Sequence, residues 1–428
     1  MMEKNNKKEN TAAGGSLSSS ISNIFFPDDF ILGTATSAFQ IEGAGKTEWQ
    51  GFIGNDKTPL NNAIMHYERY KEDMEYILYL GNAYRLSMDW SKLQKGPFGQ
   101  LDRDVLAHYE YMFKTLKENN KKVMLVLNHF SNPAWIFEYG GWPSKKTVDV
   151  FVDYSKKVLD YFGPYIDYIN TFNEPNAYGL ETYLLKEFPP KKFSIAGWKK
   201  TLKNMAQAHE LIYDYTKERH PLIQVGISYA SMLVETFSNR SLIQKVMKGF
   251  AGLIQNESVH ELFTKKGKVD FIGFSYYTRI LLAGGFTVAY AEKGRKFFEK
   301  HGLAHDDLWE IYPEGIYRNL KYFYEKYKKP LIITENGSCT EDDGLRKKVL
   351  HDHLQYVLKA INEGIPVKGY FHWSTFDNFE LATGPSRKFG LVGVDFKDPK
   401  LERKIKGSGE YYHKIAASKS LIPLNPDM

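Results

Sequence analysis

The sequence contains a single cysteine, Cys339, so no disulfide can form within its 428 residues. A fold without disulfides does not depend on an oxidising compartment, and we predict a cytoplasmic protein. No run approaches the roughly 18 uninterrupted apolar residues of a membrane-spanning helix, and residues 1–22 lack the apolar core of a secretory signal. We therefore expect no membrane partner, and we expect this N-terminal segment, rich in Ser, Asn, Lys and Gly, to be a disordered tail.

An excess of charge of one sign is also missing. The 57 Lys and Arg outnumber the 51 Asp and Glu by only 6, and no basic stripe occurs, so nucleic acid is not an expected partner. Hydrophobic residues make up 43% and charged residues 25%, which is ordinary for a globular protein with a substantial core. Aromatic residues reach 15%. Core packing accounts for most of these rings, and an excess suits a ligand that is a stackable, hydroxyl-covered ring.

The pattern of apolar residues predicts repeated βα units. From residue 30 onward, short apolar or β-branched runs alternate with longer segments of helical period. The predicted strands are residues 30–35, 83–88, 123–129, 166–172, 223–229, 271–274, 331–334 and 367–372. The predicted helices between them include residues 66–80, 102–119, 147–162, 197–219 and 344–363. Because no linker or tandem repeat interrupts the series, we predict one (β/α)8 TIM barrel domain over residues 23–428.

Polar residues favour this closed barrel over a doubly wound open sheet, which is the alternative. The runs 124–127 and 331–333 are continuously apolar, as in strands buried on both faces. Side chains capable of chemistry recur where predicted strands end: Gln40, Arg85, His129, Asn173, Glu174, Tyr277, Glu335 and Trp373. A site gathered from many strand ends is typical of the carboxyl-terminal face of a barrel. The stretch 231–268 has the weakest pattern, and we predict one or two helices in it.

Two glutamates stand where a paired-carboxylate site would need them. Glu174 follows the run 169–173 and precedes Pro175, and Glu335 follows the run 331–334 and precedes an Asn-Gly turn signal. Hydrolysis of a glycoside with retention needs two carboxyl groups about 5 Å apart, one ionised and one protonated. A single glutamate at a strand end is more often a salt-bridge partner or a helix cap. Two of them in the same setting favour a glycosidase.

Both glutamates lie in motifs that resemble glycoside hydrolase family 1. The segment Thr171-Phe172-Asn173-Glu174-Pro175 is similar to the family's acid/base motif, and Ile333-Thr334-Glu335-Asn336-Gly337 is similar to its nucleophile motif. Further similar segments, in the family's order, are residues 39–43, 84–87, 128–130, 309–315, 373–374 and 377–380. The resemblance extends from about residue 26 to 412. It implies an exo-acting, retaining β-glycosidase that needs no metal or organic cofactor.

The resemblance also implies a role for each matching residue. Glu174 is the expected acid/base and Glu335 the expected nucleophile. Arg85 and Tyr277 are expected to contact Glu335 and to favour its ionised form. Asn173 is expected to hold the sugar 2-hydroxyl. The other expected substrate-binding residues are Gln40, His129, Trp373 and Glu380 for the sugar, and Trp309 as the platform for the leaving group; alone, several of these could equally be core residues.

Two positions depart from the family's pattern. Ser275 stands where the family usually has Asn, so one hydroxyl replaces an amide, and we expect weaker support of the site. Leu381 follows Glu380 where most members have a Trp that donates to a sugar hydroxyl. We predict that Leu381 loosens discrimination at the 3- and 4-hydroxyls, so that β-glucosides and β-galactosides, with β-fucosides or β-mannosides as further candidates, react at comparable rates. Relatives that act on 6-phosphosugars usually replace the glutamate, so Glu380 favours unphosphorylated sugars.

Other patterns suggest alternatives. Residues 43–47 resemble the end of a phosphate-binding loop after a strand, but that motif needs glycine at position 40, so a nucleotide hydrolase is disfavoured. His351 and His353, two apart on a predicted helix, cannot readily share a metal ion, which favours an ordinary helical surface.

Cys339 has no evident base partner and is interpreted as a packing residue. A 6-phospho-β-glycosidase and a sugar-binding pseudoenzyme are the alternative functions, and the pseudoenzyme would lack one of the two glutamates.

Overall fold

The structure is a computed structural model that describes residues 24–43, 45–237, 258–284, 287–289 and 291–424. The expected disordered tail at residues 1–22 and the centre of the weakly patterned stretch 231–268 lie outside these ranges. None of the helices within them combines the length and the apolarity that crossing a membrane requires.

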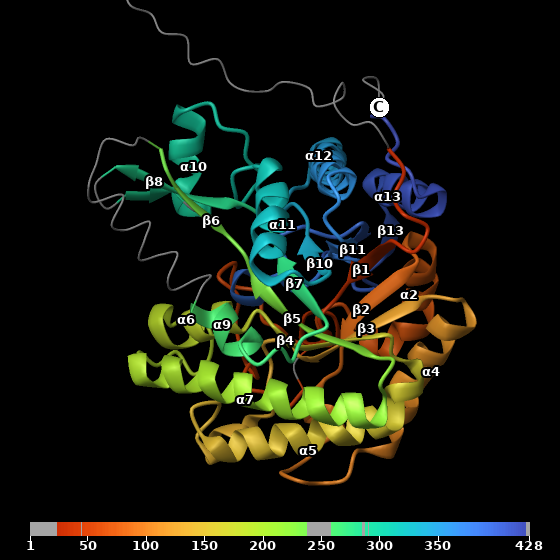
Figure 1. Cartoon of the computed structure of the whole chain (residues 1–428), viewed down its shortest axis with the longest axis vertical. Helices are drawn as coiled ribbons and strands as arrows, with labels where there is room; N and C mark the ends of the chain where they lie inside the picture. The colour runs from red at the N-terminus through yellow and green to blue at the C-terminus, as the bar shows by residue number, and fades with distance from the viewer. Residues whose placement is uncertain (1–23, 44, 238–257, 285–286, 290, 425–428) are drawn as a thin grey trace, which may run out of the picture.

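Eight parallel strands form a closed barrel in the order β1-β11-β10-β7-β5-β4-β3-β2 (Figure 1). The strands are β1 (Ile31–Ala35), β2 (Ala83–Ser87), β3 (Lys122–Asn128), β4 (Tyr168–Asn173), β5 (Gln224–Ala230), β7 (Phe271–Ser275), β10 (Leu331–Asn336) and β11 (Val367–Trp373). Each of the eight predicted strands is found within a few residues of its predicted bounds. The first strand pairs with the last, with Ile31 opposite Gly369, so the predicted barrel is confirmed and the open sheet is wrong.

Helices surround the barrel and cover its outer face. Five match the predicted ones: α2 (His66–Leu80), α4 (Arg103–Glu118), α5 (Lys145–Phe162), α7 (Ile195–Arg219) and α12 (Asp343–Asn362). The outer ring also contains α11 (Glu314–Tyr327) and α13 (Gly407–Ser418). Capping residues mark several starts: the Asp102 side chain accepts from the Asp104 and Val105 N–H groups, and Asp342 accepts from Leu345. Figure 1 shows α5 and α7 running side by side along one flank.

Side chains of each strand alternate between two buried layers. On β2, Tyr84 and Leu86 pack in the outer layer between strands and helices, whereas Arg85 between them is directed into the barrel, where it meets Glu335. The barrel interior also holds apolar side chains, among them Ile31, Met124, Phe271, Ile332 and Phe371. Both faces of the strands are thus buried, which explains their continuously apolar runs.

Shorter elements connect the strands and helices of the barrel. They are α1 (Ala38–Glu42), α3 (Trp90–Leu93), η2 (Ala134–Tyr139), α6 (Pro175–Leu180), η4 (Glu181–Leu185), β6 (Leu233–Thr236), α9 (Ser258–Thr264), β8 (Arg279–Gly284), β9 (Thr287–Ala289), α10 (Ala291–Lys300), η6 (Leu381–Thr383), β12 (Val392–Val394) and β13 (Arg403–Ile405). In the weakly patterned stretch 231–268, the predicted helix is present as α9. The strand β6, which pairs with β8, was not predicted there.

Two predicted features need correction. The histidines of α12 do not lie on a helical surface: His353 is 1% exposed and its Nδ1 lies 2.7 Å from the Val349 carbonyl oxygen, while His351 contacts the Tyr411 hydroxyl. Within the described residues, no three His, Cys, Asp or Glu side chains are grouped to hold a metal ion. Residues 43–47 follow the helix α1 and not a strand, so the order of elements in a phosphate-binding loop is absent as well. Cys339 is buried and packs beside the barrel interior, as expected.

Candidate active site

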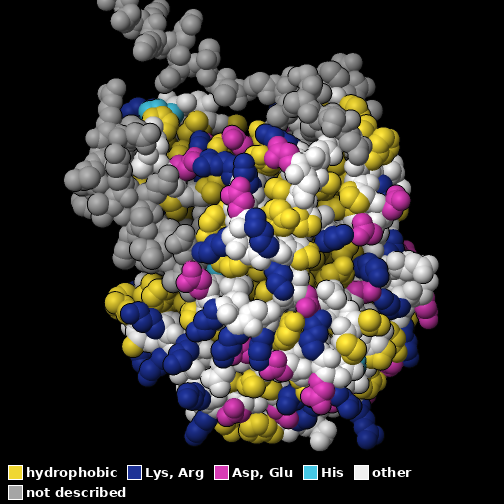
Figure 2. Space-filling view, in the orientation of Figure 1, with side chains coloured by type: hydrophobic (Ala, Val, Ile, Leu, Met, Phe, Trp, Pro, Cys, Tyr) yellow, Lys and Arg dark blue, Asp and Glu magenta, His cyan; other side chains and the backbone are white. Residues whose placement is uncertain are grey.

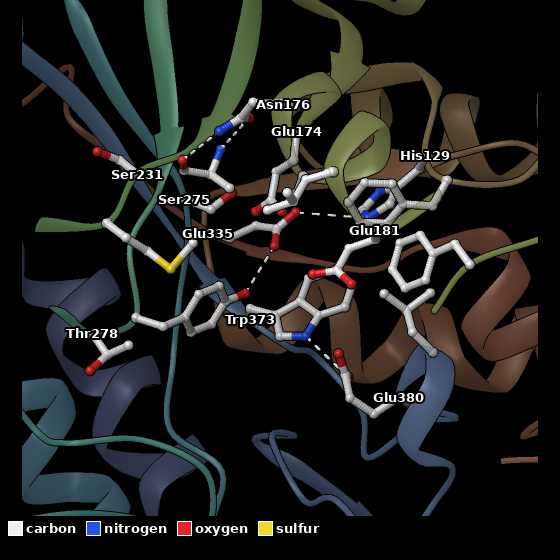
Figure 3. Close-up of a pocket in the computed structure, with 18 of the residues that line it drawn as sticks. His129, Glu174, Asn176, Glu181, Ser231, Ser275, Thr278, Glu335, Trp373 and Glu380 are labelled. Atoms are coloured by element: carbon white, nitrogen blue, oxygen red, sulfur yellow. Dashed lines mark hydrogen bonds and ion pairs between the residues drawn. The ribbon is translucent and has the colours of Figure 1, made fainter. Parts of the chain in front are cut away.

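A cavity of about 220 Å3 opens at the carboxyl-terminal ends of the barrel strands (Figure 3). Of the ten residues predicted for the site, the eight that line the cavity are Gln40, His129, Glu174, Tyr277, Trp309, Glu335, Trp373 and Glu380. The other two, Arg85 and Asn173, lie buried beneath it and contact lining residues. The barrel therefore brings together side chains that are up to 340 positions apart, as for Gln40 and Glu380.

The strand that carries Glu335 is irregular just before it. Leu331 and Ile333 on β10 pack in the outer layer and Ile332 packs inside the barrel, so strict alternation would turn residue 335 toward the helices. The pairing of β10 with β7 shifts register between Ile333 and Glu335. A local irregularity of this kind re-aims the side chains that follow it. The carboxylate of Glu335 consequently lines the cavity.

The strand before Glu174 shows the same feature. Ile169 and Phe172 on β4 both pack in the outer layer although they are three residues apart. The pairing of β4 with β5 shifts register between Asn170 and Asn173, and the side chain of Asn173 turns inward to Arg85. Glu174 then adopts a left-handed backbone conformation with φ 43°, and its N–H donates to the Ser228 carbonyl at 2.8 Å. This turn ends the strand, and Pro175 begins α6.

Glu335 is held by one cation and one hydroxyl. The Arg85 guanidinium donates through Nη1 to Oε1 at 2.6 Å, and the Tyr277 hydroxyl donates to Oε2 at 2.9 Å. Burial raises the pKa of Glu335, and Arg85 and Tyr277 act in the opposite direction. Since both partners favour the charged form over the protonated one, the negative charge of the site is favoured on Glu335.

Glu174 lacks an ion-pair partner in the described structure. Burial, with the charge of Glu335 adding to it, raises the pKa of Glu174 to about 8, and a hydrogen bond from the Ser275 side chain partly counteracts this. In Figure 3 the two carboxyl groups lie beside each other, and each comes from a different side of the barrel, since β5 and β7 stand between β4 and β10. A proton at neutral pH is thus favoured on Glu174.

Asn173 connects Arg85 to His129. Its Oδ1 accepts from Arg85 Nη2 at 2.5 Å and its Nδ2 donates to His129 Nε2 at 3.0 Å. The accepting Nε2 carries no proton, so the imidazole is in the Nδ1–H form. Burial and the nearby Arg85 charge lower the pKa of His129 well below its usual value, which agrees with a neutral ring.

The opposite wall of the cavity carries Glu380 and its two donors. Gln40 Nε2 donates to Glu380 Oε2 at 3.2 Å, and Trp373 Nε1 donates to the same oxygen at 3.4 Å. Burial raises the pKa of Glu380 to about 8. Also in the lining, the Trp309 ring lies 4.9 Å from that of Tyr277 and 5.7 Å from that of Phe389. Aromatic and polar groups therefore alternate around the cavity, as a sugar requires.

Some lining residues were missed in the sequence. Glu181, at the start of η4, directs its carboxyl group into the cavity (Figure 3), and burial raises its pKa to about 7. A signal existed, because Glu181 is two helical turns beyond Glu174 and residues at that spacing share a face. Phe188 and Met232 also line the cavity but come from irregular connections, for which periodicity gives no signal. No Lys or Arg occurs among the described lining residues.

Two carboxyl groups, one ion-paired and one not, at the mouth of a parallel barrel define the class of barrel glycoside hydrolases. The sequence profile described as glycosyl hydrolase family 1 matches residues 22–251 and 235–421. Beta-glucosidase A of Acetivibrio thermocellus is 30% identical, over 92% of this chain and 99% of that protein. The 6-phospho-beta-galactosidase of Clostridium acetobutylicum is 28% identical, over 93% and 98%. The family 1 b-glucosidase of Thermotoga maritima, solved in complex with isofagomine lactam, superposes with a TM-score of 0.83 at 28% identity, over 93% and 100%.

The chain belongs to glycosyl hydrolase family 1. It is a glycosidase of the β-glucosidase type, and the resemblance seen in the sequence is confirmed. These relatives include enzymes named for phosphorylated and for unphosphorylated sugars.

Proposed function

We propose that this chain is an exo-acting, retaining β-glycosidase for unphosphorylated β-glucosides and related β-galactosides and β-fucosides. The observation that supports this most directly is the unequal setting of the two carboxyl groups. Glu335 receives hydrogen bonds from Arg85 and Tyr277, and Glu174 has neither partner. This inequality favours one charged and one protonated carboxyl group, which a double displacement needs at its start. We assign the activity to a single catalytic domain over residues 23–428.

In the first step the carboxylate of Glu335 attacks the anomeric carbon, and the bond from that carbon to the leaving oxygen breaks. Glu174 gives its proton to the leaving oxygen, so the aglycone departs as a neutral alcohol. The product is a glycosyl ester at Glu335. Because the ester is uncharged, the Coulombic contribution that raised the pKa of Glu174 is removed.

In the second step water replaces the aglycone. Glu174, now ionised, removes a proton from the water as its oxygen attacks the anomeric carbon, and the ester bond to Glu335 breaks. The sugar leaves with its original β configuration, and both carboxyl groups return to their starting states. The two inversions at one carbon are the reason for overall retention.

The remaining predicted residues are assigned to sugar binding. Asn173, fixed between Arg85 and His129, is placed to hold the 2-hydroxyl, an interaction that strengthens as charge develops at the anomeric carbon. Trp373 offers an apolar face to the ring. The hydroxyl-binding groups we assign are Gln40, His129 and Glu380, and Trp309 is assigned to the leaving group.

Unphosphorylated sugars are favoured over 6-phosphosugars by the charge of the cavity. Its lining contains Glu174, Glu181, Glu335 and Glu380 and, within the described residues, no Lys or Arg. The surroundings raise the pKa of all four carboxyl groups, so they disfavour negative charge. A phosphate dianion would meet the same penalty without a cation to offset it. The test compares the hydrolysis of nitrophenyl β-glucoside with that of its 6-phosphate, and NMR identifies the anomer of the sugar that forms first. Faster release of nitrophenol from the 6-phosphate, or an α-configured sugar product, would refute the proposal. If neither glycoside is hydrolysed, a pseudoenzyme would be favoured.

The pH profile should depend on Ser275. Since the pKa of Glu174 lies at about 8, kcat/KM is expected to fall as the pH rises through that value and the acid loses its proton. The Ser275 hydrogen bond lowers the pKa of Glu174, so Ser275→Ala should raise it and move this descending limb to higher pH. Ser231→Ala is the matched control, because Ser231 lines the same cavity but its hydroxyl donates to Asn319. A limb that stays in place in Ser275→Ala, or moves equally in both variants, would contradict the assignment.

Leu381 should control the discrimination between sugars. It lines the cavity but cannot donate a hydrogen bond, and a site without that donor has little means to reject an epimer. We expect kcat/KM for nitrophenyl β-glucoside, β-galactoside and β-fucoside to agree within about tenfold. Leu381→Trp should widen the differences, whereas Leu381→Phe, which adds a ring without a donor, should not. A wild-type preference of several orders of magnitude for one sugar would end this explanation.

A further inference from the structure

A surface outside the cavity combines exposed apolar side chains with lysines. The stretch from the last residue of η4 to the first residue of α7 carries Leu185, Phe193 and Ile195, which are 52%, 61% and 54% exposed. Single exposed apolar side chains are common on globular proteins, but several in one short segment indicate a contact surface. In Figure 2 hydrophobic side chains protrude over α6 and the beginning of α7, with Lys and Arg side chains beside them.

Hydrogen bonds hold this segment in a compact protrusion. The Ser194 N–H donates to the Tyr183 carbonyl at 2.9 Å, which fixes the start of α7 against the end of η4. The Ser194 hydroxyl accepts from the Gly197 N–H at 2.9 Å and caps α7. The exposed apolar side chains are therefore presented by a defined backbone.

Lysines surround the apolar side chains. The exposed ones on this segment and the first turns of α7 are Lys186, Lys191, Lys192, Lys199, Lys200 and Lys203. None of them forms an ion pair with a described residue, and residues 183–203 contain only one acid, Glu187. The Lys191 ammonium lies 5.2 Å from the centre of the Phe52 ring, next to Ile53, which is 58% exposed. Unpaired cations around apolar side chains complement a surface that is anionic outside and apolar beneath.

We propose that this lysine-rich apolar face, made of residues 185–203 with Phe52 and Ile53, docks on an anionic lipid surface. The lysines would contact lipid phosphates while Leu185, Phe193 and Ile195 enter the boundary of the acyl chains. A nucleic acid would use the lysines but would leave the aliphatic side chains in water. The expectation of no membrane partner rested on the lack of a spanning helix and a secretory signal, and adsorption to a surface needs neither.

Docking at this face would also orient the catalytic cavity. Phe188 within this stretch and Glu181, four residues before it, both line the cavity. The cavity entrance would therefore open beside the lipid headgroups, where a glycoside with an apolar aglycone is concentrated. This consequence for the substrate rests on the proposed function, whereas the docking itself does not.

Sedimentation of the full chain with lipid vesicles tests the proposal. We expect binding to vesicles of phosphatidylcholine with phosphatidylglycerol, no binding to phosphatidylcholine alone, and loss of binding as the salt concentration rises. The double variants Phe193→Ser with Ile195→Ser, and Lys191→Glu with Lys192→Glu, should each weaken binding on the order of tenfold or more.

Matched controls separate docking from general charge and hydrophobicity. Leu222→Ser removes a side chain that is 90% exposed on the turn between α7 and β5, at the opposite end of the barrel. Lys397→Glu with Lys400→Glu makes the same charge change on the turn between β12 and β13. Both controls should bind the anionic vesicles like the wild type.

Activity on a soluble nitrophenyl glycoside shows whether each variant is folded and keeps failure of docking distinct from failure of catalysis. The proposal would be overturned if the wild-type protein does not bind anionic vesicles, or if the docking variants bind them as well as the controls do. So would self-association in lipid-free solution that Phe193→Ser with Ile195→Ser abolishes, because the face would then join two copies of the chain.

Discussion

Replacing Glu335 by alanine should lower kcat for a nitrophenyl β-glucoside at least roughly 10⁴-fold. In the proposed mechanism the variant lacks the group that forms the covalent intermediate, and Glu174 acts from the side of the leaving group. Arg85 and Tyr277 would remain but would have no carboxylate to orient. Initial rates measure the loss, and a thermal unfolding curve for each variant shows whether the barrel is intact.

Added azide should partly restore turnover of Glu335→Ala and identify its role. Azide can occupy the space of the missing side chain and attack the anomeric carbon from that face, expelling nitrophenolate in one displacement. One inversion gives the α-glycosyl azide, which NMR distinguishes from the β anomer. Glu181→Ala, which removes another carboxyl group lining the same cavity, should give no α-azide.

Replacing Glu174 by alanine should have an effect that depends on the leaving group. A dinitrophenolate needs no proton to depart, so the glycosyl ester should still form quickly and produce a burst of dinitrophenol. The ester should then accumulate, because no base activates water, and the steady-state kcat should fall roughly 10²- to 10⁴-fold. A methyl glycoside, whose leaving group needs the proton, should be affected in both steps.

Azide should rescue Glu174→Ala with the opposite stereochemistry. It attacks the ester that has already formed at Glu335, needs no base, and gives the β-glycosyl azide after two inversions. The two alanine variants thus form a matched pair in which the same added anion gives opposite anomers of the glycosyl azide. Identical anomers from both variants, or a β-azide from Glu335→Ala, would show that the two roles are assigned wrongly.

The sequence determined the barrel strands and most of the candidate site residues. Apolar runs such as 331–333 are continuous because helices cover one face of each strand and the barrel interior covers the other. Polar residues at the strand ends had to converge once the strands were parallel and closed, which is why eight of the ten predicted residues line one cavity. The motifs around Glu174 and Glu335 indicated the family, which the sequence comparison confirmed.

The two-residue period of a strand predicts that the side chains of Glu335 and Asn173 face the helices, but both face the inside of the barrel. Ile333 faces the helices, so Glu335 should do the same, but the register shift against β7 turns it into the cavity. The shift between Asn170 and Asn173 does likewise for the Asn173 side chain. A bulge depends on the pairing of two strands, and neither strand records it alone.

Tertiary structure also decided the environment of each group. Ser275, expected only to weaken the site, reaches Glu174 and lowers its pKa, because β7 ends beside β5 and near the turn that follows β4. The apolar face at Leu185 and Phe193 exists because Ser194 folds back on Tyr183. Local pattern determines which segments become strands or helices, since that depends on neighbouring residues. Contacts, burial and charge at a site depend on residues hundreds of positions apart, which only the closed barrel brings together.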